Sequence, residues 1–430
     1  MNKKSKEALK RLIIISIKVF KKIPALDRKN EHIVIKNGIA SNEVFYKGFR
    51  SSLKFKEEIE KEKGFHELSK ILNNETPQLF GYLTYSGVCI KLPEIDSFLF
   101  KICKFIVKEK NASKLKEKIN RIYYEVEQIL LTEKVDLEII VLLNGLHIKN
   151  KNQIIDFNHN FRLKKLSDEE LSSLLTIDYL FDQLKINPNF YSIIGITHKT
   201  ETKLTFSINP IEDIQSYVLE SLDKEIKKIL ESIHIVKKGS IQILGKFFKY
   251  SPDFIPNLNN LYYSSCQYQY LQVNVITESE SEYIEKIYEE LGKKGPNKLN
   301  IAIARLTDSE NRLSPIDSLI DSIIGIESLI NPTDTGEQTF KMSLYYAFLF
   351  EKEKRKENYN TLKSVFNTRN KIVHGGIGTN TSTDLFLLDQ ASDGKNILRK
   401  LIEKFLFDEK LKKQKKDYWI DLILSSDLEN

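Results

Sequence analysis

The chain has 430 residues, of which 41% are hydrophobic and 29% charged, with a net charge of +7. This length exceeds the roughly 100–200 residues of a typical domain, so we expect two or three domains, and the positive charge permits nucleic-acid binding without requiring it. The three cysteines (Cys89, Cys103 and Cys266) form no CxxC pair, which excludes a disulfide framework and a cysteine zinc site and favours a cytoplasmic location.

The N-terminal segment MNKKSKEALKRLIIISIKVFKK contains a short apolar run, LIIISI. A membrane span needs about 20 apolar residues, and a signal peptide needs an apolar region of about 7–15 residues with a cleavage site. The sequence therefore predicts no membrane partner here. We expect a solvated first helix, and a basic amphipathic helix lying on a membrane surface remains the alternative.

Strand and helix patterns alternate over the next two hundred residues. Segments rich in β-branched and aromatic residues with nearby glycines predict strands within 79–165 and 240–275. Apolar spacing predicts helices at 113–132 and 213–234. Ser167, followed three residues later by Glu170, has the pattern of a capping box at the start of a further helix.

From about residue 296 the pattern becomes helical, after a polar stretch at 278–298 that we interpret as a connecting helix and a linker. Ser314 and Pro315 are typical of a helix start, and Gly375 and Gly376 of a helix end. The predicted fold is α+β, with a mixed, strand-rich region 1–295 and an all-α helical bundle 296–430. The expected helices cover 299–311, 315–330, 337–355, 358–374 and at least one segment of 394–425.

The stretch FNTRNKIVHGG, 366–376, places a scarce residue type near a histidine. About ten of the 66 basic residues are arginine, so Arg369 carries more information than any lysine run. Arg369 and His374 are five positions apart, a rotation of about 140° on a helix, whereas Asn370 and His374 share a face. We expect the splayed pair to converge in one cleft when two copies of the helix meet around a twofold axis.

These residue types suit the cleavage of RNA. A histidine can accept the proton of the 2′-hydroxyl or donate one to the leaving oxygen. A guanidinium can bind the developing phosphorane charge through two hydrogen bonds, and Asn370 can orient the histidine or a phosphate oxygen. The chemistry needs no metal and no cofactor.

RNKIVHG resembles the R-x4-6-H motif of HEPN domains, and its context is similar to the Apea-like branch of that family. The context is DSLIDSIIGIESLI, with Glu327 in an I-E-S-L element, then a helix, then the motif. The resemblance covers 297–424. Upstream, the mixed β region, FRLKKLSDEEL and a second strand-rich stretch resemble, more weakly, other proteins with that domain.

The resemblance implies a helical HEPN bundle, a homodimer formed through it, and a metal-independent endoribonuclease that acts in bacterial anti-phage defence or a toxin system. The region 1–295 would then sense a phage or cellular trigger. In the family the third helix often carries an arginine where this chain has Lys341, which lacks the planar fork of a guanidinium. Glu327, set among apolar neighbours, is expected to pair with a basic residue such as Arg369.

Each assignment has a structural alternative. Arg369 could form an ion pair, and His374 could interact with the helix dipole; the whole domain could bind RNA or a partner without catalysis. Asp317 and Asp321 are expected on the polar face of their helix, with a metal or acid–base role as the alternative. GSIQILGK, 239–246, does not fit a phosphate-binding loop. KLKKQKK, 410–416, is expected to be solvated or to contact RNA, and the tyrosines of 261–272 to pack in a sheet or stack on bases.

Overall fold

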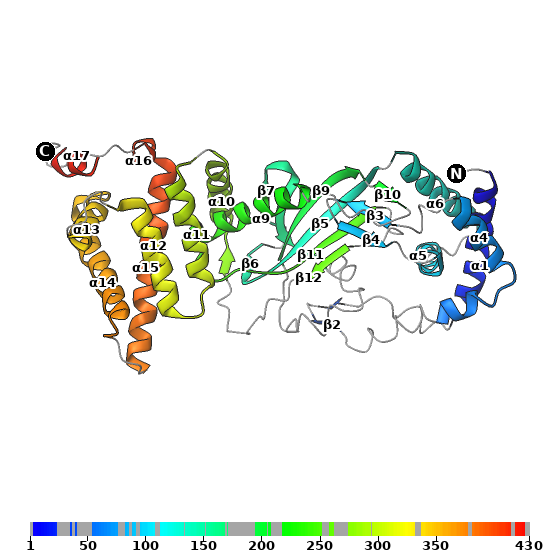
Figure 1. The fold of residues 1–430 in the computed structure, drawn as a ribbon, viewed down its shortest axis with the longest axis horizontal. Coiled ribbons are helices and arrows are strands. Elements are labelled where there is room, and N and C mark those ends of the chain that lie inside the picture. Colours follow the sequence, from blue (N-terminus) through cyan, green and yellow to red (C-terminus); the bar gives the residue numbers. More distant parts are fainter. Residues whose placement is uncertain are drawn as a thin grey trace. The chain divides into compact units, whose positions relative to one another are not determined.

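The structure is a computed structural model, and it describes residues 3–23, 35–36, 39–40, 54–75, 82–85, 88–91, 95–107, 112–132, 134–150, 152–167, 170, 194–203, 205–207, 217–251, 258–261, 274–293, 295–331, 337–376, 381–413 and 418–425. The chain forms two compact units (Figure 1). The first unit consists of Met1–Asn144, Asn158–Asp223 and Ile243–Gln267, and the second of Gly145–Phe157, Lys224–Gln242 and Tyr268–Asn430. The predicted tyrosine-rich strand at 262–272 lies outside the described residues.

The helices of the first unit pack around its N-terminal helix. They are α1 (Lys3–Lys22), α4 (Phe65–Glu75), α5 (Ile95–Val107) and α6 (Ala112–Thr132). The apolar face of α1 is buried against the other three, and the rings of Phe20, Phe55 and Phe100 meet with centroids 5.1–6.2 Å apart. The expectation of a solvated first helix was therefore wrong. Its apolar side is covered by helices that a periodicity argument on α1 alone could not identify.

The strands of the first unit are largely antiparallel. In the longer sheet, β12 (Leu258–Leu261), β11 (Gln242–Ser251), β5 (Lys134–Asn144), β9 (Ile194–Lys203) and β8 (Phe161–Lys165) are neighbours in that order. A smaller sheet has the order β10 (Thr205–Ser207), β3 (Tyr82–Tyr85), β4 (Val88–Lys91), and β1 (Ile35–Lys36) pairs with β2 (Ile39–Ala40). Buried residues of β5, such as Ile139 and Val141, face His198 and Ile196 of β9 in register.

The second unit combines three short strands with most of the helices. Its strands are β6 (Leu146–Ile148), β7 (Ile154–Phe157) and β13 (Asn274–Ile276), and β6 pairs with β13 in parallel. Its helices are α9 (Tyr217–Val236), which it shares with the first unit, and α10 (Glu278–Leu291), α11 (Asn297–Asn311), α12 (Pro315–Ile330), α13 (Gln338–Phe348), η3 (Lys352–Lys354), α14 (Arg355–Val373), α15 (Thr381–Phe407), α16 (Glu409–Lys412) and α17 (Tyr418–Ser425).

Helix α12 lies at the centre of the bundle and packs against α11, α13, α14 and α15 (Figure 1). Its close approach to α15 depends on small residues. A Cβ at Gly325 would meet the side chain of Leu398 at 2.6 Å, and one at Gly394 would meet Ser322 at 3.2 Å. The hydroxyls of Ser309, Ser318 and Ser322 satisfy one another at the buried α11–α12 contact. These contacts fix the helix that carries Glu327.

The chain is an α+β protein, and the described residues from 295 to 425 contain helices and no strand. The cap predicted at Ser314 and Pro315 is confirmed, because the Ser314 hydroxyl accepts the Asp317 N–H at 3.3 Å. The helix predicted at 337–355 is too long, because α13 ends at Phe348 and α14 already begins at Arg355. The guanidinium of Arg355 lies 4.2 Å from the Phe348 ring across this break.

Residues 278–291 form α10, which was expected to be a connecting helix. Its Ile284 and Ile287 are instead buried in the second unit.

Candidate functional site

The RNKIVHG stretch forms the last turns of α14, and its end is fixed by backbone hydrogen bonds. Gly375 adopts a φ of 69°, and its N–H donates to Ile372 O at 3.1 Å, while the Gly376 N–H donates to Lys371 O at 2.8 Å. This pair of bonds is the Schellman arrangement, which requires a residue that tolerates the left-handed region. His374 is therefore held as the C-cap residue of the helix.

Helix α14 is anchored to α15 just before the candidate residues. The hydroxyls of Ser364 and Thr368 lie 3.1 Å and 3.2 Å from the Oε1 atom of Gln390, and Thr368 and Gln390 are buried. A buried amide oxygen that accepts two hydroxyl donors fixes the rotation of α14 about its axis. This rotation determines which side chains of the RNKIVHG stretch point away from α15.

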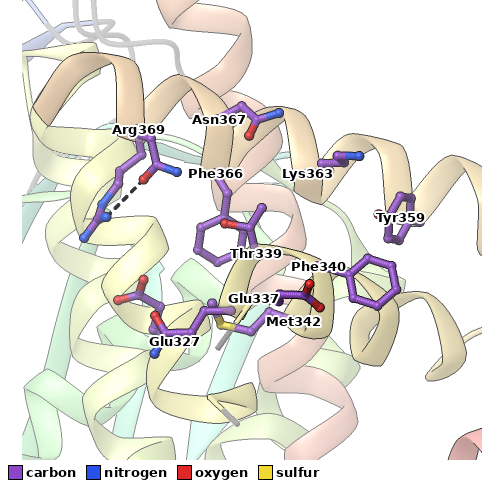
Figure 2. Close-up of a pocket in the computed structure, with 12 residues that line it drawn as sticks. Glu327, Glu337, Thr339, Phe340, Met342, Tyr359, Lys363, Phe366, Asn367 and Arg369 are labelled. Atoms are coloured by element: carbon purple, nitrogen blue, oxygen red, sulfur yellow. Dashed lines mark hydrogen bonds between the residues drawn. The ribbon is translucent and has the colours of Figure 1, made fainter. Parts of the chain in front are cut away.

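Arg369 points from α14 into an open groove of about 720 Å³ on the second unit (Figure 2). Its Nη1 donates to Asn370 Oδ1 at 3.2 Å, so the guanidinium and the amide are held together. Buried Met342 and Phe366 belong to the lining of the groove. The complete lining comes from α12, from the start of α13 and from α14: Glu327, Glu337, Gln338, Thr339, Phe340, Met342, Tyr359, Lys363, Phe366, Asn367, Arg369 and Asn370.

Glu327 lies on α12 at the same end of the groove as Arg369, its predicted partner (Figure 2). Burial raises the pKa of the Glu327 carboxyl, and the positive charge of Arg369 opposes this effect in part. The hydrogen bond of Arg369 goes to Asn370 and not to Glu327. The interaction between the two charged groups is therefore electrostatic, and the guanidinium keeps donors directed into the groove.

His374 is not part of the groove lining. It is exposed at the end of α14, one turn beyond Asn370, whose carbonyl accepts its N–H at 3.1 Å. Within one chain the structure therefore brings Arg369 and Asn370 together and leaves His374 apart. This agrees with the rotation of about 140° between Arg369 and His374 on a helix. Lys341 is half-buried on α13 and does not line the groove, although its neighbours Phe340 and Met342 do.

The charged residues that line the groove are of both signs. Lys363 and Arg369 are opposed by Glu327 and Glu337. The sequence did not identify most of the other lining positions, among them Phe340, Tyr359, Lys363 and Asn367. A signal for three of them exists on α14, because Tyr359, Lys363, Phe366, Asn367 and Asn370 recur at helical spacing and so share one face.

Asp321 does not lie on a solvated polar face, so that expectation was wrong. It is 4% exposed, and its carboxylate oxygens accept from Arg305 at 2.8 Å and from Arg312 at 2.7 Å. Asp317, in contrast, is exposed. Two guanidiniums from α11 and the α11–α12 turn compensate the buried charge, because a buried carboxylate requires partners.

A second buried charge, on Glu310, joins the end of α11 to the middle of α15 and to the turn that follows α9. The Glu310 side chain has no exposed surface and accepts from Arg399, from Lys395 at 3.2 Å and from the Gly239 N–H at 2.8 Å. Burial alone would raise the pKa of Glu310, but these two cations and the N–H lower it below its usual value. The Gly239 N–H is thus occupied within the protein, and strand β11 follows from Gln242, which agrees with the rejection of a phosphate-binding loop.

Within the described ranges, no group of three or more His, Cys, Asp or Glu side chains is arranged to hold a metal ion. None of the helices described in the structure is both long enough and apolar enough to cross a membrane. Comparison of the chain with protein-family models, with curated proteins and with solved structures finds no match.

Proposed function

We propose that this protein is a metal-independent endoribonuclease of the HEPN type. The observation that carries the proposal is the open groove into which Arg369 and Asn370 point together, with His374 exposed one turn further along the same helix. The resemblance of RNKIVHG to the family motif agrees with it. The first unit would act as a sensor of a phage or cellular trigger in bacterial defence or in a toxin system.

The chemistry follows from the groups available. The 2′-oxygen attacks the adjacent phosphorus, and the bond from phosphorus to the 5′-oxygen of the next nucleotide breaks. One His374 accepts the 2′-hydroxyl proton, and a water molecule donates a proton to the leaving 5′-oxygen. Arg369 binds the two non-bridging oxygens as negative charge develops on them, and Asn370 orients the guanidinium. The products are a 2′,3′-cyclic phosphate and a free 5′-hydroxyl.

His374 requires a second chain in this scheme. Arg369 faces the groove and His374 does not, so one copy of α14 does not present both groups to one phosphate. Two copies related by a twofold axis place both pairs around a shared cleft. The active species is accordingly a homodimer formed through the helices of the second unit.

The decisive experiment is cleavage of a defined oligoribonucleotide in EDTA, with the product ends identified by mass spectrometry. We expect cyclic-phosphate and 5′-hydroxyl ends, and no cleavage of the matching DNA. His374→Ala should lower the rate by about 10²–10⁴, and Arg369→Lys should impair cleavage because an ammonium does not form the two-pronged contact. Lys356→Ala, which changes an exposed residue at the other end of α14, is the matched control.

Products with 5′-phosphate ends, or cleavage that requires magnesium, would show that these residues are not the active site. A mixture of Arg369→Lys and His374→Ala chains tests the shared cleft. Hybrid dimers hold one intact arginine and one intact histidine, so the mixture should cleave faster than the sum of the separate variants.

A non-catalytic protein that dimerises through the helical bundle and binds RNA or a partner is the second candidate. The balanced charge of the groove and the absence of His374 from its lining favour this alternative. Binding of RNA by the wild type without any cleavage, unchanged by His374→Ala, would select it.

A further inference from the structure

We infer that the groove contains a nucleobase subsite, built by Phe340, Tyr359 and Glu337, that binds an unpaired base with an exocyclic amino group. The inference rests on the proposed function in taking RNA as the ligand, and it adds a specificity determinant away from the Arg369 end. Figure 2 shows the division: Arg369 and Glu327 lie at one end of the groove, and Phe340 and Tyr359 at the other.

The two rings form an accessible aromatic corner. Their centroids are 6.1 Å apart at an interplanar angle of 74°, so an edge of one ring meets the face of the other. Phe340 is 47% exposed, although it lies in a helix whose Met342 and Tyr346 are buried. An exposed phenylalanine that lines a groove offers an open face, and a base that stacks on such a face typically gains binding energy.

Lys363 connects this corner with the Arg369 end. It is exposed, and its Nζ lies 5.4 Å from the centre of the Tyr359 ring. Lys363 and Arg369 are six residues apart on α14, a rise of about 9 Å. Two cations at this separation along one groove suit a chain of phosphates, with the base of one nucleotide directed to the aromatic corner. Bases inside a duplex do not expose their faces, so the ligand is single-stranded.

Glu337 gives the subsite its selectivity. It lies beside Phe340 in Figure 2 and is a non-glycine residue with a φ of 53°. A left-handed conformation is strained for a residue with a side chain, and such strain is concentrated at functional positions. A carboxylate in a groove for a polyanion would weaken binding unless it accepts a hydrogen bond from the ligand. Cytosine N4 is a donor of the kind that glutamate accepts, whereas uracil has a carbonyl oxygen at that position.

The test uses the full chain with His374→Ala, so that bound RNA stays intact, and measures the anisotropy of labelled oligocytidylate and oligouridylate of equal length. Oligocytidylate should bind about 5-fold or more tightly than oligouridylate. Phe340→Leu or Tyr359→Leu should weaken both complexes by about 5- to 100-fold, and Tyr359→Phe should retain binding. Glu337→Gln should remove the preference for cytosine without weakening oligouridylate.

Tyr124→Leu removes an exposed aromatic ring from α6, and it should bind both oligomers as the parent does. Thermal melting of each variant separates a loss of the subsite from a loss of folding. Unchanged affinity of both folded leucine variants would overturn the subsite, and equal affinity for the two oligomers would overturn the role of Glu337. If the wild type binds with the cytosine preference but cleaves nothing, the nuclease proposal fails and the subsite stands. If both leucine variants cleave RNA with unchanged KM, the subsite fails and the nuclease proposal stands.

Discussion

At the scale of single residues, the scarcity of arginine indicates a function only when the partners of each arginine are known. Arg305 and Arg312 compensate Asp321, and Arg399 donates to Glu310 and to the carbonyl of His234 at 3.1 Å. These arginines stabilise buried carboxylates. Arg369 instead donates to its neighbour Asn370 and faces an open groove. The distinction separates a structural arginine from a candidate ligand-binding one, and sequence alone does not provide it.

Glu327 gives a pH-dependent prediction. Its pKa is raised in the folded state, so its contribution to stability is greatest below the unfolded pKa and is lost as pH rises through the folded pKa. Glutamine does not titrate, so the Glu327→Gln variant does not lose stability in this way. The difference between its free energy of unfolding and that of the wild type should therefore increase from about pH 4 to about pH 8. Chemical denaturation at a series of pH values measures this difference. Glu357→Gln, an exposed residue of α14, controls for the change in net charge; a relative stability of Glu327→Gln that falls with pH would contradict the prediction.

At the scale of secondary-structure elements, the end of α14 is set by two adjacent glycines with different requirements. Gly375 needs its positive φ, while a Cβ on it would meet nothing within 4 Å. Gly376 has no such φ, and a Cβ there would lie 3.4 Å from Lys371 O. Substitution of Gly375 therefore tests backbone strain, and substitution of Gly376 tests steric overlap, at the helix end that orients His374.

Gly375→Ala should destabilise the protein by about 1–2 kcal/mol, because alanine is strained in the left-handed region. It should also lower cleavage by displacing His374 from the end of the helix. Gly376→Ala should have the smaller effect on both. Thermal denaturation and the cleavage assay give the two readouts, and equal effects of the two substitutions would show that the Schellman arrangement does not position His374.

The junction of α9, α11 and α15 depends on Glu310. Glu310→Ala would leave Arg399 buried without its carboxylate, and loss of one partner of a buried pair typically costs about 3–5 kcal/mol. We expect a loss of this size in the free energy of unfolding, measured by urea denaturation. Glu282→Ala, on the exposed side of α10, should change it by no more than about 0.5 kcal/mol. If Glu310→Ala changed the free energy of unfolding as little as Glu282→Ala, the hydrogen bonds and ion pairs of Glu310 would not stabilise the protein.

The sequence predicted features that depend on neighbouring residues better than features that depend on residues far apart in the chain. Caps at Ser314 and Gly375 depend on a few adjacent residues, so their sequence pattern sufficed. The burial of α1 and of Asp321 depends on residues far along the chain, which periodicity does not reveal. The groove was only partly anticipated for the same reason: Arg369, Asn370 and Glu327 were named, but Glu337 and Phe340 reach it through the packing of α13 against α14.

At the scale of the whole molecule, an apolar surface at one end of the α14–α15 pair suits the proposed dimer. Val373 is 59% exposed, and Leu385, Phe386 and Leu388 are exposed on the first turns of α15. Helices α14 and α15 pack together, and Val373 directly precedes His374 in the chain. A standard dimer buries about 1,200–2,000 Å² in total, and these side chains are candidates for its apolar part.

Light scattering should give a mass twice the 50.1 kDa of one chain. Leu385→Glu combined with Leu388→Glu should produce monomers and abolish cleavage, because buried glutamates would oppose one another across the twofold axis. Asp384→Asn, an exposed change on the same turn of α15, is the control and should leave both the mass and the cleavage unchanged. A monomeric wild type that still cleaves RNA would refute the shared cleft.

The second unit is discontinuous in the chain, and this has a consequence during synthesis. Its first segment begins at Gly145, but Gln390, which anchors α14, and Arg399, which binds Glu310, lie in its last segment, on α15. On a translating ribosome the RNKIVHG stretch is made before either partner. A nascent chain therefore lacks the contacts that orient Arg369 until α15 has been translated. The proposed ribonuclease would therefore gain its oriented arginine only after α15 has been made.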